Sequence, residues 1–177
     1  VRITNAAGST TSVSVDAVPA GPPTQTTDVT AKGTGTSGQI KVTWTTPANN
    51  GAPITSFDII NGATNAVLKN ITAATDPLFW TDQVTNQGTS CTYFLTGMPN
   101  GTTYQIKVRA NNSAGSGQMS GTASAYAYTK PGAPTDVKVT AGTKSLTVSW
   151  TAPSNGGSAI TKYEVFEVIN GTVGTAP

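Results

Sequence analysis

Apolar side chains occupy every second position in several short runs, and clusters of Gly, Pro and Asn separate these runs. The runs are Ile40–Trp44, Phe57–Ile59, Tyr104–Ala110, Leu146–Trp150 and Tyr163–Val165, with weaker examples at Val13–Ala17 and Ala123–Ala127. A period of two places one face of a strand in a core and the other face in solvent. We therefore predict an all-β protein in which two antiparallel sheets pack face to face.

The chain also repeats itself with a period close to 100 residues. The segment Val42–Thr55 returns as Val148–Thr161, and the segment Val1–Ser9 returns as Val108–Ser116. A period of this length corresponds to one small domain rather than to a turn of a solenoid. The sequence thus predicts the end of one domain, a complete second domain and the beginning of a third.

Proline-containing segments mark the joins between these domains. We assign residues 1–18 to the preceding domain, 24–129 to the complete domain and 135–177 to the following one, with linkers at 19–23 and 130–134. Prolines keep such short linkers extended and stiff, so successive domains are expected to sit end to end with restricted bending. Because half a sandwich cannot bury its inner face, we interpret the two terminal units as parts of a longer polypeptide.

Several spaced motifs resemble those of fibronectin type III domains. They are the Pro-Thr lead-in, the Val-x-Trp strand with its following proline, the Asn/Gly loop that ends in Ile-Thr, and the run Leu95–Tyr104 continuing into Val108–Gly115. The chain resembles a tandem array of such domains of the bacterial or phage type. The resemblance implies antiparallel immunoglobulin-like β-sandwiches in tandem, with strands F and G in residues 1–18 and strands A to C′ in residues 135–177.

The same resemblance assigns roles to three aromatic residues. Trp44, Tyr104 and Trp150 correspond to structural core positions of the family. Tyr104 also matches a corner tyrosine, whose hydroxyl ties back to the preceding loop.

The connection between Asn61 and Ser90 is longer than is usual in this family. It contains the densest apolar cluster outside the predicted strands, namely Leu78, Phe79 and Trp80. Two interpretations stay open. Either Leu78 or Trp80 folds back to close the open edge of the sandwich, or Phe79 and Trp80 stand on an exposed loop and contact a neighbouring subunit or a ligand.

Residues that carry chemistry are sparse in this chain. It contains no histidine, and its two glutamates, Glu164 and Glu167, both lie in the third domain. Asp76 and Asp82 flank the apolar cluster, but two carboxylates without an Asp-x-Asp spacing are weak support for calcium. Cys91 alternates with apolar neighbours, which favours a buried thiol. We therefore predict a non-enzymatic protein without catalytic residues, cofactor or metal.

Charge and hydropathy limit the partners. The net charge is +2, and the Lys and Arg residues are scattered, which disfavours nucleic acid and anionic membranes as partners. No stretch approaches the roughly 20 apolar residues that span a bilayer, so no membrane insertion is predicted in this segment.

The predicted function is that of a structural or adhesive array in a larger extracellular, cell-surface or virion-associated protein. The array would act as a rigid spacer and contact module, and its partners would be copies of itself, neighbouring subunits or surface glycans. The alternative is a linker array in a secreted carbohydrate-active enzyme or carbohydrate-binding protein whose functional domain lies outside this chain.

Overall fold

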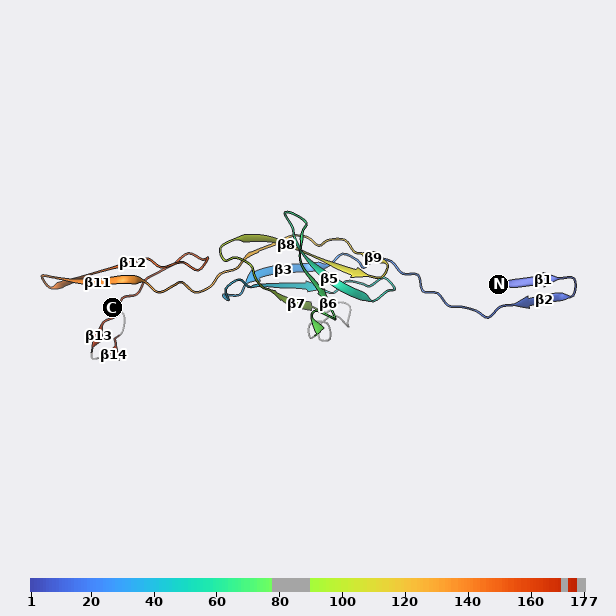
Figure 1. Ribbon diagram of the computed structural model, residues 1–177, viewed down its shortest axis with the longest axis horizontal. Coiled ribbons are helices and arrows are strands. Elements are labelled where there is room, and N and C mark those ends of the chain that lie inside the picture. Colours follow the sequence, from blue (N-terminus) through green and yellow to red (C-terminus); the bar gives the residue numbers. More distant parts are fainter. Residues whose placement is uncertain (78–89, 170–171, 175–177) are drawn as a thin grey trace.

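The structure is a computed structural model that describes residues 1–77, 90–169 and 172–174. The elements described below are β-strands. They form three groups along one line: a hairpin near the N-terminus, a two-sheet sandwich in the middle and a C-terminal group (Figure 1). We call these groups the N-terminal hairpin, the middle sandwich and the C-terminal unit.

Two antiparallel sheets make up the middle sandwich. The first has the order β3-β4-β7, with β3 at Thr27–Gly33, β4 at Ile40–Thr45 and β7 at Ser90–Leu95. The second has the order β10-β8-β5-β6, with β10 at Ala123–Tyr126, β8 at Thr103–Asn112, β5 at Ile54–Asn61 and β6 at Val67–Thr72. A short strand, β9 at Gly115–Ser116, pairs with the end of β8. The prediction of an all-β antiparallel sandwich is confirmed.

The core lies between the two sheets, where the period-two pattern of β4 faces that of β5 and β8. Along β4, Ile40, Val42 and Trp44 are at most 1% exposed. The Trp44 ring lies 5.2 Å from the ring of Phe57 on β5, so this aromatic pair joins the two sheets. Ile59, Leu95, Ile106 and Val108 are buried in the same core, whereas Tyr104 is half-buried against it.

The N-terminal hairpin repeats a turn of the middle sandwich. It consists of β1 at Arg2–Asn5 and β2 at Gly8–Thr11. Gly8 in its turn and Gly115 between β8 and β9 have φ angles of 140° and 137°. In both turns the Oδ1 of an asparagine, Asn5 or Asn112, accepts a hydrogen bond from the backbone N–H two residues further on. The 107-residue repeat read from the sequence is therefore present in the backbone.

Residues 13–17, predicted as a strand, form no strand in the structure. Their counterpart in the middle sandwich is β10, which pairs with residues 103–106 of β8. Among the described strands, none pairs with residues 13–17. An extended segment without a partner strand lacks the ladder of hydrogen bonds that defines a strand.

The C-terminal unit contains β11 at Thr135–Gly142, β12 at Ser145–Thr151, β13 at Val168–Ile169 and β14 at Thr172–Val173. Trp150 and Tyr163 repeat the aromatic pair of the middle sandwich, with ring centroids again 5.2 Å apart. Residues 163–165, predicted as a strand, are not one. Their counterpart β5 pairs with β8 on one side, and a counterpart of β8 is missing among the described residues of this unit.

Candidate interaction surfaces

The aromatic cluster predicted as an interaction loop, Leu78, Phe79 and Trp80, lies outside the described residues, and so does Asp82. The structure does describe the place where this connection leaves the sandwich. It starts after β6, and β7 begins at Ser90.

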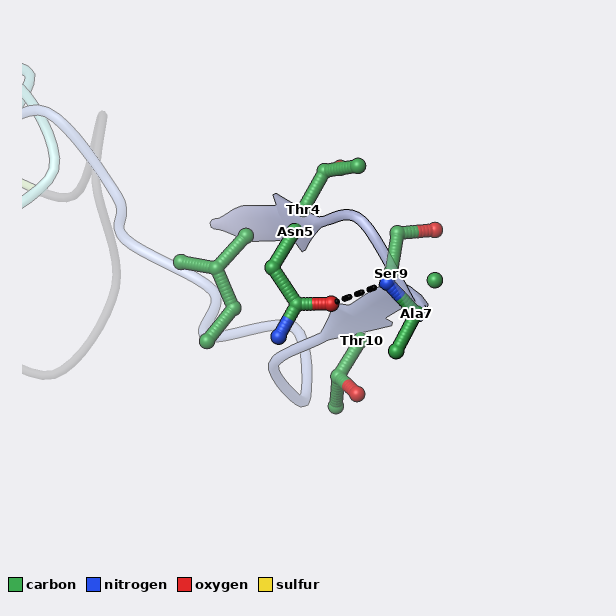
Figure 2. Close-up of a pocket in the computed structure, with 7 residues that line it drawn as sticks. Thr4, Asn5, Ala7, Ser9 and Thr10 are labelled. Atoms are coloured by element: carbon green, nitrogen blue, oxygen red, sulfur yellow. Dashed lines mark hydrogen bonds between the residues drawn. The ribbon is translucent and has the colours of Figure 1, made fainter.

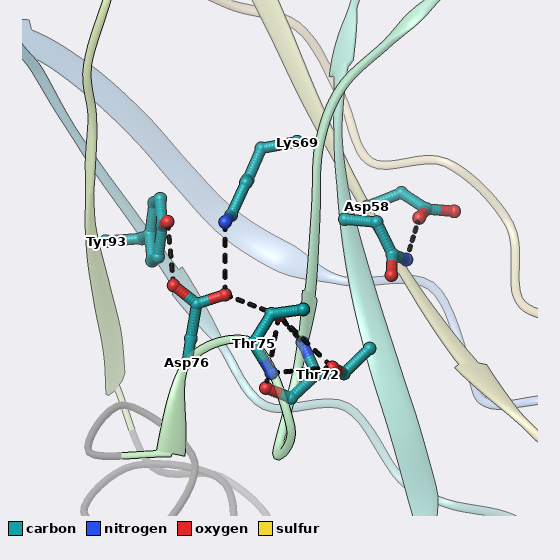
Figure 3. Close-up of polar contacts among 7 residues, drawn as sticks. Asp58, Lys69, Thr72, Thr75, Asp76 and Tyr93 are labelled. Atoms are coloured by element: carbon teal, nitrogen blue, oxygen red, sulfur yellow. Dashed lines mark hydrogen bonds and ion pairs between the residues drawn. The ribbon is translucent and has the colours of Figure 1, made fainter.

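Asp76 fixes the start of this connection against the sheet. Its backbone N–H donates to the carbonyl of Thr72, 2.9 Å away, and closes a turn directly after β6. The Asp76 carboxylate accepts hydrogen bonds from the Tyr93 hydroxyl at 3.0 Å and from the Thr75 hydroxyl at 2.7 Å. It also forms an ion pair with Lys69 of β6 at 3.2 Å. Figure 3 shows Asp76 between Tyr93 and Lys69, with Thr72 and Thr75 beside it.

The hydrogen-bond donors around Asp76 keep its carboxylate ionised. Burial raises the pKa of Asp76, but the hydrogen bonds from Thr75, Tyr93 and Lys69 outweigh that effect and hold the pKa below its ordinary value. Burial and the bond to Asp76 raise the pKa of the Tyr93 hydroxyl, which remains a donor at neutral pH. Because donors of the protein occupy the carboxylate, Asp76 is a poor ligand for a cation. The described residues contain no group of three or more His, Cys, Asp or Glu side chains that could hold a metal ion.

A second polar cluster joins three strands of the larger sheet. Asp58 of β5 accepts hydrogen bonds from Arg109 of β8 at 2.7 Å, from Asn70 of β6 at 2.7 Å and from Asn111 of β8 at 3.1 Å. Burial raises the pKa of Asp58, but these three partners together hold it below its ordinary value. The Asp58 side chain is only 8% exposed. A carboxylate so enclosed serves as a cross-strand tie and not as a general base.

Cys91 is a buried thiol in the core of the sandwich. Its Sγ lies 3.0 Å from the Thr46 hydroxyl, within hydrogen-bond distance. Burial raises the pKa of the Cys91 thiol, and the bond with Thr46 offsets only part of that effect. A thiol that is fully covered and protonated at neutral pH is not a nucleophile.

The three aromatic residues assigned from the family resemblance differ in their surroundings. Trp44 is buried, whereas Tyr104 and Trp150 are half-buried. The implied tie of the Tyr104 hydroxyl to the preceding loop is not made, because no described residue forms a hydrogen bond with it. Asn100 holds that loop instead: its Oδ1 accepts from the Gly38 N–H at 2.9 Å, and its Nδ2 donates to the Ser37 hydroxyl at 3.0 Å.

A side-chain amide that sequence reasoning did not single out holds one end of the middle sandwich together. The Nδ2 of Asn112 lies 2.8 Å from the carbonyl of Gly21, 2.9 Å from that of Asn49 and 3.3 Å from that of Ala52. It therefore connects the incoming linker with the loop between β4 and β5. The sequence offered one indication that Asn112 has a structural role: the repeat of Val1–Ser9 at Val108–Ser116 aligns it with Asn5.

The counterpart residue Asn5 lines an open hollow of about 410 Å³ on the N-terminal hairpin. Figure 2 shows its side chain with Thr4, Ser9 and Thr10, and its Oδ1 accepts the bond from the Ala7 N–H at 2.8 Å. The hollow is lined by small polar and apolar residues without an ionisable side chain. It offers hydrogen bonds but no group for acid–base or nucleophilic chemistry.

Comparison with known proteins identifies the sandwich. A family model described as the fibronectin type III domain matches residues 21–126. The chain belongs to the fibronectin type III family. This family model covers most of the middle sandwich, from the incoming linker to the end of β10.

One curated relative of this fibronectin type III chain is the cell adhesion molecule Dscam2 of Drosophila melanogaster. It is 36% identical over 86 residues, which cover 47% of this chain and 4% of Dscam2. This chain therefore spans only a small part of the length of that relative.

Two solved structures are similar to this chain at lower identity. The FN1–FN3 domains of chicken CNTN1 are 24% identical with a TM-score of 0.45, and the match covers 93% of this chain and 54% of theirs. A structure described as FN3tt mut is 16% identical with a TM-score of 0.39, covering 58% of this chain and 92% of its own. A search of the described residues for a helix long and apolar enough to cross a membrane found none.

Proposed function

We propose that this chain is a non-catalytic spacing and contact module of a larger extracellular or cell-surface protein, in which fibronectin type III units follow one another in tandem. The observation that carries this proposal is the recurrence of the same local structure along the chain. The turn at Gly8 recurs at Gly115, and the Trp44–Phe57 ring pair recurs as Trp150–Tyr163. Elements of one fold arranged in a line extend a polypeptide and set the distance between whatever lies at its two ends (Figure 1).

The state of the ionisable groups supports a scaffold role. Asp58 and Asp76 are each enclosed by protein donors, and Cys91 is covered by the core. Each of these groups is held by hydrogen bonds within the sandwich. The similarity of a segment to a cell adhesion molecule supports protein contacts and a place at the cell surface.

The contact role is assigned to the connection that begins at Asp76. Its aromatic residues, Phe79 and Trp80, are the residue types that anchor protein interfaces. Asp76, Tyr93 and Lys69 fix the start of this connection on the sheet, which lowers the entropy lost when the following residues bind a partner. A second copy of the chain or a neighbouring subunit is the proposed partner.

Sedimentation velocity of the full chain tests both roles in one experiment. The spacing role predicts a frictional ratio above that of a compact particle of equal mass. The contact role predicts association that increases with concentration and is lost when Phe79 and Trp80 are both replaced by Ser. Phe94→Ser is the control, because Phe94 is an aromatic residue of the same sandwich that is 50% exposed.

Thermal melts of the same variants separate contact from packing. If the two aromatic residues form an interface, the double variant keeps the melting midpoint of the parent while its association weakens. If they close the edge of the sandwich, their removal costs roughly 3–5 kcal/mol per aromatic lost. A large drop in midpoint, or association that survives the double replacement, contradicts the contact role.

A further inference from the structure

Each linker pairs with a loop of the unit that follows it. In the middle sandwich the N–H groups of Gly21 in the linker and of Thr24 directly after it donate to carbonyls of the loop at residues 46–53, at 2.9 and 3.0 Å. In the C-terminal unit the N–H groups of Thr129 and Gly132 donate to carbonyls of the loop at residues 152–159, at 2.8 and 2.9 Å. The two donors are shifted by the same 108 residues, so both linkers are fixed in the same way to the unit ahead.

The loop that receives the linker contains two consecutive residues with positive φ angles. These angles are 51° at Asn50 and 86° at Gly51, and 66° at Gly156 and 92° at Gly157. Glycine adopts this backbone region without the steric cost that a Cβ adds. The second residue of each pair, Gly51 or Gly157, also lies where an added side chain has no room.

Gly157 lies directly against the middle sandwich. A Cβ placed on it would lie 2.6 Å from the backbone nitrogen of Gly101 and 2.9 Å from the Cβ of Asn100. That Asn-Gly turn is held by the middle sandwich, because the Gly101 N–H donates to the carbonyl of Ala127 at 2.9 Å and Asn100 bonds Ser37 and Gly38. The contact therefore joins a fixed turn of one unit to a fixed loop of the next.

Gly51 occupies the same place at the joint before the middle sandwich. A Cβ on Gly51 would collide with the carbonyl oxygen of Pro19 and lie 3.4 Å from the Cα of Ala20. The 108-residue shift between the linkers aligns Pro19 with Ala127, whose carbonyl binds Gly101 in the other joint. At this first joint the glycine faces the start of the incoming linker, whereas Gly157 at the second joint faces the Asn100–Gly101 turn of the preceding unit.

We propose that Gly157 is the contact that sets the angle between the middle sandwich and the C-terminal unit, and that its partner is the Asn100–Gly101 turn. A bare Cα at Gly157 lets the two backbones touch, and the two backbone hydrogen bonds of the linker hold the loop of the C-terminal unit in place. Any side chain at this position wedges the joint open. The inference rests on the proposed spacing function, because it names the contact that makes the spacing directional.

Spin labels on the two units of the full chain test this contact. Ala63→Cys in the middle sandwich and Thr143→Cys at the β11–β12 turn place labels on exposed residues, and buried Cys91 stays unlabelled. Double electron–electron resonance is expected to give one narrow distance distribution for the parent. Gly157→Ala is expected to shift this distribution and broaden it.

Gly97→Ala is the matched control. Gly97 has a φ of 76°, so alanine there meets comparable backbone strain, but nothing lies within 4 Å of its added Cβ. This variant is expected to keep the narrow distribution. Asn100→Ala approaches the joint from the opposite side, and it is expected to broaden the distribution while leaving the backbone of the C-terminal unit untouched.

The proposal is overturned if the parent distribution is already broad, or if both Gly157→Ala and Asn100→Ala leave it unchanged. If the contact is absent but the units are still arranged as a string, the frictional ratio of the chain stays high, because flexibly joined units still form an elongated particle. A low frictional ratio instead contradicts the spacing function itself, so the two failures are distinguishable.

Discussion

Replacement of Gly33 by Ala is expected to destabilise the middle sandwich, although alanine favours ordered backbone over glycine. Gly33 ends β3 and is buried where β3 crosses β10. A Cβ at this position would collide with the carbonyl oxygen of Tyr126 and lie 2.5 Å from the Cε1 of Tyr128. Ordinary contact begins at 3.4 Å, so the neighbouring atoms must give way by roughly 1 Å. The Tyr126 oxygen belongs to the backbone of β10, which cannot yield as a side chain can.

Overpacking of this kind costs typically about 1–3 kcal/mol. For a domain of this size, that corresponds to a drop in melting midpoint of roughly 4–8 °C for each kcal/mol. The matched variant is Gly121→Ala: Gly121 is exposed, and nothing lies within 4 Å of an added Cβ. That change is expected to raise stability by about 0.4–1 kcal/mol, because it restricts the unfolded chain. Denaturant unfolding of both variants measures the difference. A Gly33→Ala variant as stable as Gly121→Ala would refute the packing of β3 against β10.

Further predictions concern buried side chains of the sandwich. The folded-state pKa of Asp58 is held below its ordinary value of 3.8, so its stabilisation is complete above that value and is lost as the pH falls through the folded pKa. Denaturant unfolding from neutral pH down to pH 3 should therefore show a steeper loss of stability for the parent than for Asp58→Asn, and parallel profiles would contradict this. Trp44→Ala should lower the stability of the middle sandwich by about 3–5 kcal/mol. Trp150→Ala should leave its calorimetric transition unchanged, and equal losses would argue against separate cores.

The strands of the middle sandwich were predictable because their side chains alternate. Ile40, Val42 and Trp44 carry the period directly, and all three are buried. Residues 13–17 and 163–165 carry a similar pattern but are not strands. The alternation shows which face of a segment is apolar, whereas strand formation also needs a neighbouring strand in register.

The contacts between distant loops were not predictable from the pattern. Asn112 binds the carbonyl of Gly21, which is 91 residues away, and its sequence context predicts only a turn. The sequence around Asp58 shows a carboxylate between the apolar residues Phe57 and Ile59, but its burial depends on Arg109, which is brought beside it by the pairing of β5 with β8. Hydrogen bonds of this kind depend on the register between strands and loops, which local propensity does not specify.

Small-angle X-ray scattering of the full chain in dilute solution tests the central claim most directly. If the units stand in line with fixed joints, the distance distribution is skewed toward long distances, and the radius of gyration lies well above the roughly 16 Å of a compact 177-residue protein. It also lies well below the roughly 45 Å of an unfolded chain of this length. A symmetric distribution with a radius of gyration near the compact value would show that the units fold back on one another, and it would contradict the spacing function.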